Sequence, residues 1–223
     1  MLSIRTDEFL ECVQKGDLAK VKEMLARNPE LADSKTRNGV SSILQAFYYG
    51  RPEIARTIAD KKRELDVFEA SVLGRLDRVK ILTKQNYSLI DSYSPDGFPV
   101  LALAAYLGQD EVTEYLISQG ANVNAVAKNP TGFTALTGAV ANDHTEISKL
   151  LIQHGANVNH RYEDGASPLM EAAMNGNLEL VNFFIKHGAE INVKTKDGKS
   201  PLSLASEKQH VAVIEALRKN GAI

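Results

Sequence analysis

The stretch from residue 165 to residue 194 decides the fold, and it reads GASPLMEAAMNGNLELVNFFIKHGAEINVK. In its first part Leu169, Ala172 and Ala173 stand at i, i+3 and i+4, which is the spacing of one apolar helix face with small residues at the packing surface. A serine followed by a proline supplies a capping hydroxyl and a first-turn proline at the start of this helix. Gly176 supplies the positive φ that ends it.

The second part of this stretch predicts another helix, from Asn177 to His187. Its apolar residues fall on one face before the chain reaches Gly188; they are Leu178, Val181, Phe184 and Ile185. The following segment up to Gly198 is rich in Asn, Asp, Lys and Gly, so it reads as a turn. One helix pair followed by a polar loop is therefore the predicted unit.

The same unit recurs along the chain. Two further copies are GFTALTGAVANDHTEISKLLIQHGANVNHR (132 to 161) and GKSPLSLASEKQHVAVIEALRKNGAI (198 to 223). The residue at the turn between the two helices marks each copy: Gly16, Gly50, Gly74, Gly108, Asp143, Gly176 and Gln209. These positions are separated by 34, 24, 34, 35, 33 and 33 residues. Because one helix pair cannot bury its apolar face alone, the units are expected to stack in a single file.

This pattern resembles the ankyrin repeat, which reads roughly DGxTPLHxAAxxGxxxVVxxLLxxGAxVN. The resemblance extends over essentially the whole chain and is most specific from residue 95 onward. It implies an all-α fold, an ankyrin-repeat α-solenoid of stacked helix-turn-helix units with finger loops or short β-hairpins. The chain is then a single ankyrin-repeat domain, residues 1–223. Its units are an N-terminal capping repeat at about 4–38, repeats at about 39–64, 65–94, 95–129, 130–162 and 163–195, and a C-terminal capping repeat at about 196–223.

The chain departs from that pattern at the TPLH tetrapeptide. The corresponding segments begin at Pro99, Thr134, Ser167 and Ser200 and read PVLA, TALT, SPLM and SPLS. All four lack the histidine, which in the family ties neighbouring repeats together. We therefore expect weaker polar ties between units than in idealised members.

Two of the inter-helix turns lack glycine. Asp143 and Gln209 stand where a left-handed conformation is expected, which Asp tolerates but which costs Gln about 1 kcal/mol. The last unit also has no later unit to cover it. We expect this C-terminal unit to open first.

The 24-residue spacing from Gly50 to Gly74 is the most unusual feature. It leaves only KKREL, residues 61–65, to connect a helix at about 52–60 to one that begins near Asp66. The long finger is therefore expected to be deleted here. The deletion is either a local loss that the stack tolerates or a shaped gap in the row of fingers that admits a partner.

Composition excludes several function classes. The 26 basic and 28 acidic residues nearly balance, which disfavours non-specific binding to nucleic acid or lipid headgroups. The longest apolar run, residues 98–108, falls short of the roughly 20 residues that cross a bilayer. The lone Cys12 cannot form an internal disulfide. We expect a cytoplasmic protein that is monomeric alone and contacts neither nucleic acid nor membrane, and the segment 65–82 is similar to a subset of bacterial ankyrin proteins.

Motifs that carry chemistry are missing. GxSxG, HExxH, CxxC and GxGxxG do not occur, so we expect no catalytic residue, no metal and no cofactor. The histidines, such as His144, His187 and His210, lie at helix ends and turns, where structural capping explains them better than metal binding. The basic triplet at residues 61–63 is interpreted as a solvated turn, with contact to an acidic partner as the minor alternative.

Two classes of function remain. In the ankyrin family the concave face of finger loops and first helices grips another protein, which implies a non-catalytic protein-protein interaction module or scaffold with an unidentified partner. The alternative is a small-molecule-responsive regulator or enzyme-associated subunit built on the same scaffold, which requires titratable residues clustered in a pocket.

Aromatic residues predict where a partner binds. Half of the 14 aromatics fall on the predicted concave face: Tyr48, Tyr49, Tyr93, Phe98, Tyr106, Phe133 and Tyr162. Exposed Tyr and Phe at the centre of such a strip are typical binding hot spots. The hypothesis is a contiguous patch of Tyr49, Tyr93, Phe98 and Tyr106 beside the gap at 61–65. For Phe47 and Tyr48 the alternative is that their rings fill the space left by the deleted finger.

Overall fold

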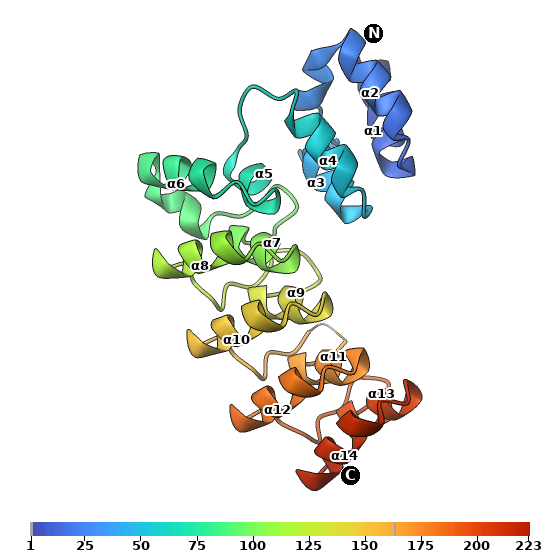
Figure 1. Cartoon of the computed structure of the whole chain (residues 1–223), viewed down its shortest axis with the longest axis vertical. Coiled ribbons are helices and arrows are strands. Elements are labelled where there is room, and N and C mark those ends of the chain that lie inside the picture. The colour runs from blue at the N-terminus through green and yellow to red at the C-terminus, as the bar shows by residue number, and fades with distance from the viewer. Residues whose placement is uncertain (1, 163) are drawn as a thin grey trace.

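A computed structural model shows the chain as a single-file stack of helix pairs (Figure 1). It describes residues 2–162 and 164–223, with side chains from residue 5 onward. The α-helices along this part of the chain are α1 (Leu2–Lys15), α2 (Leu18–Arg27), α3 (Ser42–Tyr48), α4 (Pro52–Ala59), α5 (Val67–Val72), α6 (Leu76–Gln85), α7 (Val100–Tyr106), α8 (Asp110–Ser118), α9 (Ala135–Ala141), α10 (Thr145–Gln153), α11 (Pro168–Asn175), α12 (Leu178–Lys186), α13 (Pro201–Glu207) and α14 (Val211–Lys219). Two short 3-10 helices, η1 (Pro29–Asp33) and η2 (Tyr87–Asp91), follow α2 and α6. The predicted all-α ankyrin-repeat solenoid is confirmed.

The helices form two rows. The first helix of each pair packs on the first helix of the next, from α1 through α13, and the second helices form the other row (Figure 1). We call the row of second helices the outer row. Its helices contact one another in sequence from α6 to α14, but α4 and α6 make at most a marginal contact. We call the surface formed by the first helices and their adjoining loops the inner face.

Local chemistry sets the helix ends, as α11 illustrates. The hydroxyl of Ser167 accepts a hydrogen bond from the backbone N–H of Met170, Pro168 occupies the first turn, and Gly176 ends the helix at φ 75°. These three roles were predicted. Asp143 and Gln209 both adopt φ 59°, so the two expected left-handed positions without glycine are also confirmed.

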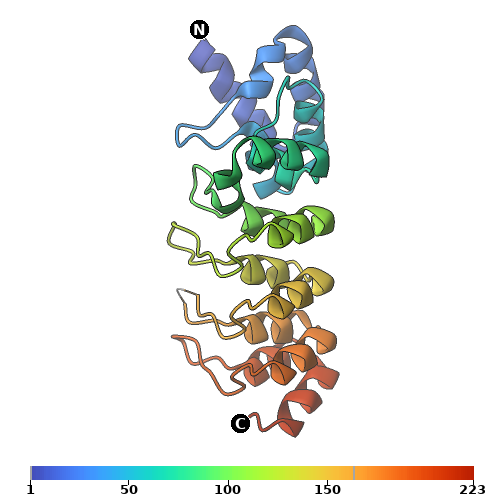
Figure 2. The ribbon, with the colours of Figure 1, turned by 90° about the vertical axis from the view of Figure 1, so that its left-hand side faces the viewer.

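Finger loops project from one side of the stack (Figure 2). Two of them close with an isolated antiparallel bridge, Lys35 to Ser41 and Tyr93 to Pro99. Between α4 and α5 the chain instead takes a short path through residues 60–66, with no such bridge among the described residues. The deletion of this finger agrees with the sequence prediction, and we call residues 60–66 the fingerless link.

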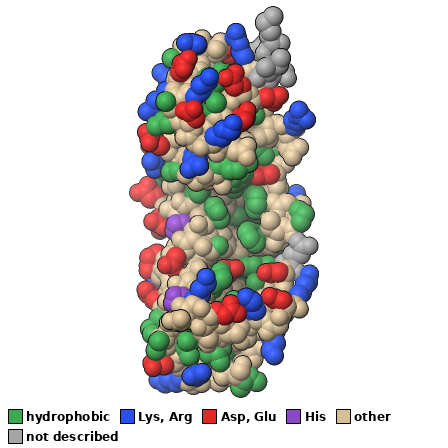
Figure 3. Space-filling model, turned by 90° about the vertical axis from the view of Figure 1, so that its right-hand side faces the viewer, with side chains coloured by type: hydrophobic (Ala, Val, Ile, Leu, Met, Phe, Trp, Pro, Cys, Tyr) green, Lys and Arg blue, Asp and Glu red, His purple; other side chains and the backbone are tan. Residues whose placement is uncertain are grey.

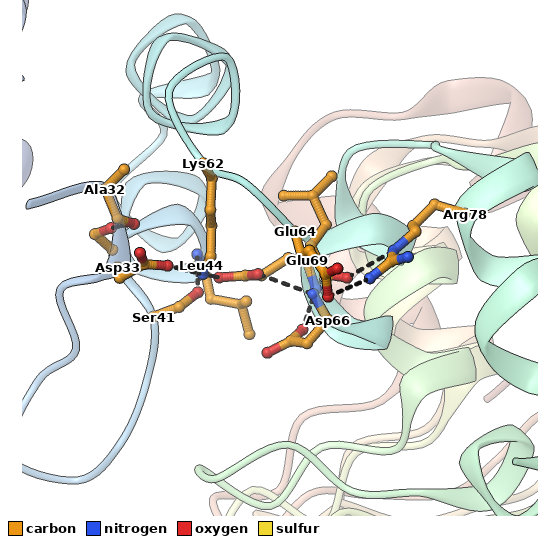
Figure 4. Close-up of polar contacts among 11 residues, drawn as sticks. Ala32, Asp33, Ser41, Leu44, Lys62, Glu64, Asp66, Glu69 and Arg78 are labelled. Carbon is orange, nitrogen blue, oxygen red and sulfur yellow. Dashed lines mark hydrogen bonds and ion pairs between the residues drawn. The ribbon is translucent and has the colours of Figure 1, made fainter. Parts of the chain in front are cut away.

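The fingerless link is not the solvated turn that its charges suggested. The side chain of Lys62 is only 7% exposed, and its ammonium lies 2.5 Å from Oε1 of Glu69, whose side chain is fully buried (Figure 4). Asp33 of η1 lies 3.5 Å from the same ammonium. Glu69 also completes a capping box with Asp66 at the start of α5. Because no finger is present here, the side chain of Lys62 reaches from one unit to the next. The prediction of a solvated turn is therefore wrong for this residue.

The core divides where the fingerless link lies. One buried cluster is built by α1 to α4 together with Val72 and Leu103, and a second runs from α5 to α14. A small third cluster joins Tyr162, Ala166 and Met170. Phe184 and Leu151 are typical fully buried members of the second cluster, and Phe9 and Ile43 of the first. Within each of the first two clusters, stacking buries apolar surface that no single helix pair could bury alone.

Polar ties between units come from positions other than the missing TPLH histidine. A ring nitrogen of His144 lies 3.1 Å from the carbonyl oxygen of Tyr106, and one of His210 lies 3.0 Å from that of Met174. Neither ring caps its own helix. Both carbonyl oxygens lie in the last turn of the preceding unit's first helix, so these two histidines cap that helix instead of their own. His187 does bond a carbonyl of its own helix end, that of Phe183.

The described part of the chain contains no helix long and apolar enough to cross a membrane.

Candidate functional site

The inner face carries a pocket of about 280 Å³ between α3, α7 and α9. Its walls are aromatic and its floor is made of small and apolar groups. The lining residues are Tyr48, Asp96, Phe98, Ala102, Leu103, Tyr106, Phe133, Thr134 and Gly138. In Figure 3, hydrophobic side chains gather in a hollow near the middle of this face. We call it the aromatic pocket.

Gly138 helps to open the aromatic pocket. The same helix position in other units holds Gln45, Leu103, Glu171 and Leu204, so α9 alone among these inner helices lacks a side chain there. A Cβ at Gly138 would lie 3.2 Å from the Cβ of Tyr106, tighter than an ordinary contact. The missing side chain therefore lets α9 approach the backbone of α7 at Tyr106 closely and adds no atoms to the hollow that Gly138 lines.

One acidic residue lies in the aromatic pocket. Asp96 is half-buried, and its Oδ1 accepts a hydrogen bond from the hydroxyl of Ser94 at 2.5 Å. Its backbone oxygen accepts one from the side-chain amide of Asn129 at 2.8 Å, so the next finger holds it in place. Burial, and secondly the charge of Asp96, raise the pKa of the Tyr48 hydroxyl, which therefore remains a protonated donor.

A second hollow of about 490 Å³ adjoins the pocket and shares the ring of Phe133. It is lined by Thr131, Phe133, Tyr162, Asp164, Glu171 and Lys196, and we call it the acidic hollow. The rings of Phe133 and Tyr162 meet edge to face with centroids 5.4 Å apart. Tyr162 is 9% exposed, and its buried hydroxyl has no hydrogen-bond partner among the residues that the structure describes. Burial, followed by the charge of Asp164, raises the pKa of the Glu171 carboxyl.

The predicted aromatic residues separate into two groups. Tyr48, Phe98, Tyr106 and Phe133 line the aromatic pocket, and Tyr162 lines the acidic hollow next to it. Tyr48 remains 39% exposed and approaches Phe98, with ring centroids 6.3 Å apart.

The other predicted aromatics lie elsewhere. Tyr49 ends α3 and is exposed, but it does not line the pocket. The ring of Tyr93 lies 3.9 Å from the ammonium of Lys128 and also stays outside the pocket. Phe47 packs against the buried cluster of α1 to α4, which agrees with the alternative that its ring fills the space left by the deleted finger. Tyr48 does not pack against this cluster.

Sequence reasoning missed the charged members of the site. Asp96 and Asp164 both directly precede a finger glycine, Gly97 and Gly165, where turn chemistry alone explains an aspartate. The recurrence of an aspartate at the same position of two fingers was the one feature of the sequence that could have drawn attention to them. Glu171 stands on the exposed side of the helical pattern of α11, and nothing in the sequence distinguished it from an ordinary surface residue.

The gap beside the fingerless link is a separate hollow of about 580 Å³ on the outer side. Cations and anions alternate on its wall, among them Arg63, Glu64, Arg75 and Asp77. Arg78 donates hydrogen bonds to the backbone oxygen of Leu65 and to Glu64, which fixes the link against α6 (Figure 4). No single type of ligand matches this mixture of charges.

Metal-binding geometry is not found in the described part of the chain, which holds no group of three or more His, Cys, Asp or Glu side chains arranged for a cation. Ring nitrogens of His144, His160, His187 and His210 instead lie within hydrogen-bond distance of backbone carbonyl oxygens. Burial raises the pKa of the Cys12 thiol, which disfavours the reactive thiolate.

Comparison with known sequences identifies the family. Residues 67–162 match a family described as ankyrin repeats (3 copies), and residues 151–205 match one described as ankyrin repeats (many copies). Together the matches extend over more than half of the chain. The chain therefore belongs to the ankyrin-repeat family.

Two curated relatives share this repeat region, both called ankyrin repeat and SAM domain-containing protein 6. The protein from Danio rerio is 37% identical over 65 residues, which are 29% of this chain and 9% of that protein. The protein from Rattus norvegicus is 32% identical over 123 residues, which are 51% of this chain and 14% of that protein. The chain thus matches only a small part of either relative. Both organisms are eukaryotes, so they lend no support to the predicted bacterial source, which stays a prediction.

Proposed function

We propose that the chain is a non-catalytic module that holds a partner protein on its inner face, with the aromatic pocket as the anchor. Ankyrin repeats are protein-protein interaction modules, and the chain has the repeats. The observation that supports this site is the convergence of four aromatic rings on one open hollow. Aromatic side chains in a central, well-packed pocket contribute disproportionately to the affinity of protein interfaces.

The alternative of a small-molecule-responsive regulator depends on the same pocket. Ligand sites for small molecules usually enclose roughly 300–1,000 Å³, and the aromatic pocket encloses about 280 Å³. That volume lies at the lower edge of the range, so size alone does not separate a partner's side chain from a free ligand, whereas the ankyrin repeats favour a protein partner. The proposal therefore favours a macromolecular partner.

The test places a photoreactive benzoylphenylalanine at Tyr106 and, as a matched control, at Tyr87. Tyr87 is a strongly exposed tyrosine in η2 and lies outside the aromatic pocket. After irradiation in cells of the source organism, we expect a cross-linked protein at position 106 and not at position 87. The captured partner is then purified and its affinity measured against Tyr106→Ala and Tyr87→Ala.

We expect Tyr106→Ala to weaken the partner's binding by roughly tenfold or more, because truncation of a hot-spot ring removes about 2 kcal/mol. Melting temperatures show whether each variant remains folded. An unchanged affinity in a folded Tyr106→Ala variant, or cross-linking confined to position 87, would contradict the proposal.

A further inference from the structure

Two neighbouring hollows on the inner face each combine aromatic rings with a carboxylate. Asp96 lies among the rings of the aromatic pocket, and Asp164 and Glu171 lie beside Tyr162 in the acidic hollow. None of these three carboxylates has a cationic partner within 4 Å in the part of the chain that the structure describes. By contrast, the buried Glu69 and the inter-unit Glu179 are both paired with lysines.

The chemistry of the aromatic pocket suits a positively charged side chain. Ring faces attract a cation placed within about 6 Å of the ring centroid, and a planar guanidinium also stacks on them. The apolar floor at Ala102 and Leu103 accommodates the methylene stem of a long basic side chain. Asp96 supplies the counter-charge at the end of that stem. An acidic side chain entering the pocket would be repelled, and a purely apolar one would desolvate the Asp96 carboxylate without supplying a counter-charge.

The acidic hollow provides an independent observation. Within residues 2–162 and 164–223, the buried hydroxyl of Tyr162 finds no hydrogen-bond partner, although buried polar groups are normally hydrogen-bonded. Glu171 is partly desolvated next to Asp164, an arrangement that is unfavourable until a positive charge arrives. A guanidinium can donate to the carboxylate and to the phenol oxygen together, because it carries five N–H donors. Lys196 lies at the edge of this hollow, yet it forms no ion pair with either carboxylate among the described contacts.

We propose, on the basis of the function above, that the partner presents an extended basic segment, with one arginine in the aromatic pocket against Asp96 and a second in the acidic hollow against Glu171 and Asp164. The two hollows adjoin successive inner helices, which pack about 8–10 Å apart. An extended polyproline-type chain rises about 3.1 Å per residue with three residues per turn, so side chains three positions apart point the same way about 9 Å apart. The spacing favours arginine, two residues, arginine.

The probe is a fluorescein-labelled peptide, Gly-Ser-Arg-Pro-Pro-Arg-Ser-Gly, and its control replaces both arginines with citrulline. Citrulline keeps the length and planarity of the side chain but carries no charge. Fluorescence polarisation against the full chain should show that the arginine peptide binds roughly tenfold or more tightly than its citrulline twin. A peptide with only one residue between the arginines should bind less tightly than the probe.

Variants locate the binding site. Asp96→Asn and Glu171→Gln should each weaken the arginine peptide several-fold, and the two together should weaken it more. Asn can still accept the hydrogen bond from Ser94, so the finger is expected to keep its shape. Glu114→Gln removes the same charge from an exposed position on the outer helix α8, and should leave the affinity unchanged.

Equal affinity for the arginine and citrulline peptides would overturn the inference, and so would a loss in Glu114→Gln as large as that in Asp96→Asn. The proposed function is tested separately by cross-linking at position 106. If a partner is captured there and binds Asp96→Asn and Glu171→Gln as tightly as the unmodified chain, the inner face binds a protein but the basic segment is wrong.

Discussion

The fingerless link and the finger-bearing connection between α8 and α9 join neighbouring units in different ways. At the second connection the contacts are many and modest: Lys128 donates a backbone hydrogen bond to Gly97, and Asn129 donates through its amide to Asp96. At the fingerless link, the ion pair of Lys62 with Glu69 crosses a gap in the outer row. The comparison teaches that, where a finger is deleted, a buried charge pair joins apolar contacts in holding two units together in place of a distributed backbone network.

The largest expected effect follows from breaking that pair. Lys62→Met leaves Glu69 buried and uncompensated, and loss of one partner of a buried ion pair costs about 3–5 kcal/mol. We expect the free energy of unfolding of the α1 to α4 block to fall by about 3 kcal/mol, as measured by urea titration and hydrogen exchange. The exposed pair of Lys15 with Glu11 supplies the control, because Lys15→Met should have little effect. If Lys62→Met lowered the free energy of unfolding by less than about 1 kcal/mol, the pair of Lys62 and Glu69 would not be a main contact across the fingerless link.

A connection that carries a finger should lose little stability when one hydrogen-bonding side chain between the units is removed. The Asn124 amide donates to the carbonyl of Gly155, and its oxygen accepts from the backbone of Asn157, both at exposed positions. Equivalent amides, Asn159 and Asn192, make the same contact one and two units further on. We expect Asn124→Ala to cost about 1 kcal/mol in urea unfolding, since the remaining contacts persist. A cost equal to that of Lys62→Met would remove the contrast between the two connections.

The unit of α13 and α14 contains a left-handed residue other than glycine, so its local strain can be measured by a single substitution. Gln209 adopts φ 59°, where a non-glycine residue pays about 1–2 kcal/mol. Gln209→Gly relieves this strain but costs about 0.5–1 kcal/mol of chain entropy, so the net gain should lie between about 0 and 1.5 kcal/mol. Hydrogen exchange should show slower opening at residues 200–223. Unchanged exchange there would mean that packing, rather than the turn, limits this unit.

The smallest effect concerns pH. The pKa of Glu171 is raised by burial and by Asp164, with Tyr162 and Lys196 as the other titratable groups around the hollow. A raised pKa means that the folded state holds the proton more tightly than the unfolded state, so this residue increasingly opposes folding as the pH rises through its folded pKa. We expect Glu171→Gln to be slightly more stable than the unmodified chain at pH 8, with the difference vanishing below about pH 4. A pH-independent difference in urea midpoint would contradict this.

The sequence was sufficient for the repeat, the helix caps, the left-handed turns and the deleted finger, because each depends on spacing and local backbone chemistry. It also placed Tyr48, Phe98, Tyr106 and Phe133 on one surface, since alignment of units fixes which positions share a face. The burial of Lys62 was missed because a charged link reads as solvated until the shape of the gap around it is known. Asp96 and Glu171 were missed for a related reason, as their significance depends on neighbours from other units.

At Gly138, the stability of the helix and the size of the aromatic pocket favour different residues. Alanine in a helix interior is favoured over glycine by about 0.5–1 kcal/mol, so a gain of one methyl group would suit α9 considered alone. That methyl would press on Tyr106 and narrow the hollow on the inner face. A single methyl group at this position would therefore trade a better helix former for a tighter contact with the neighbouring unit and a smaller hollow.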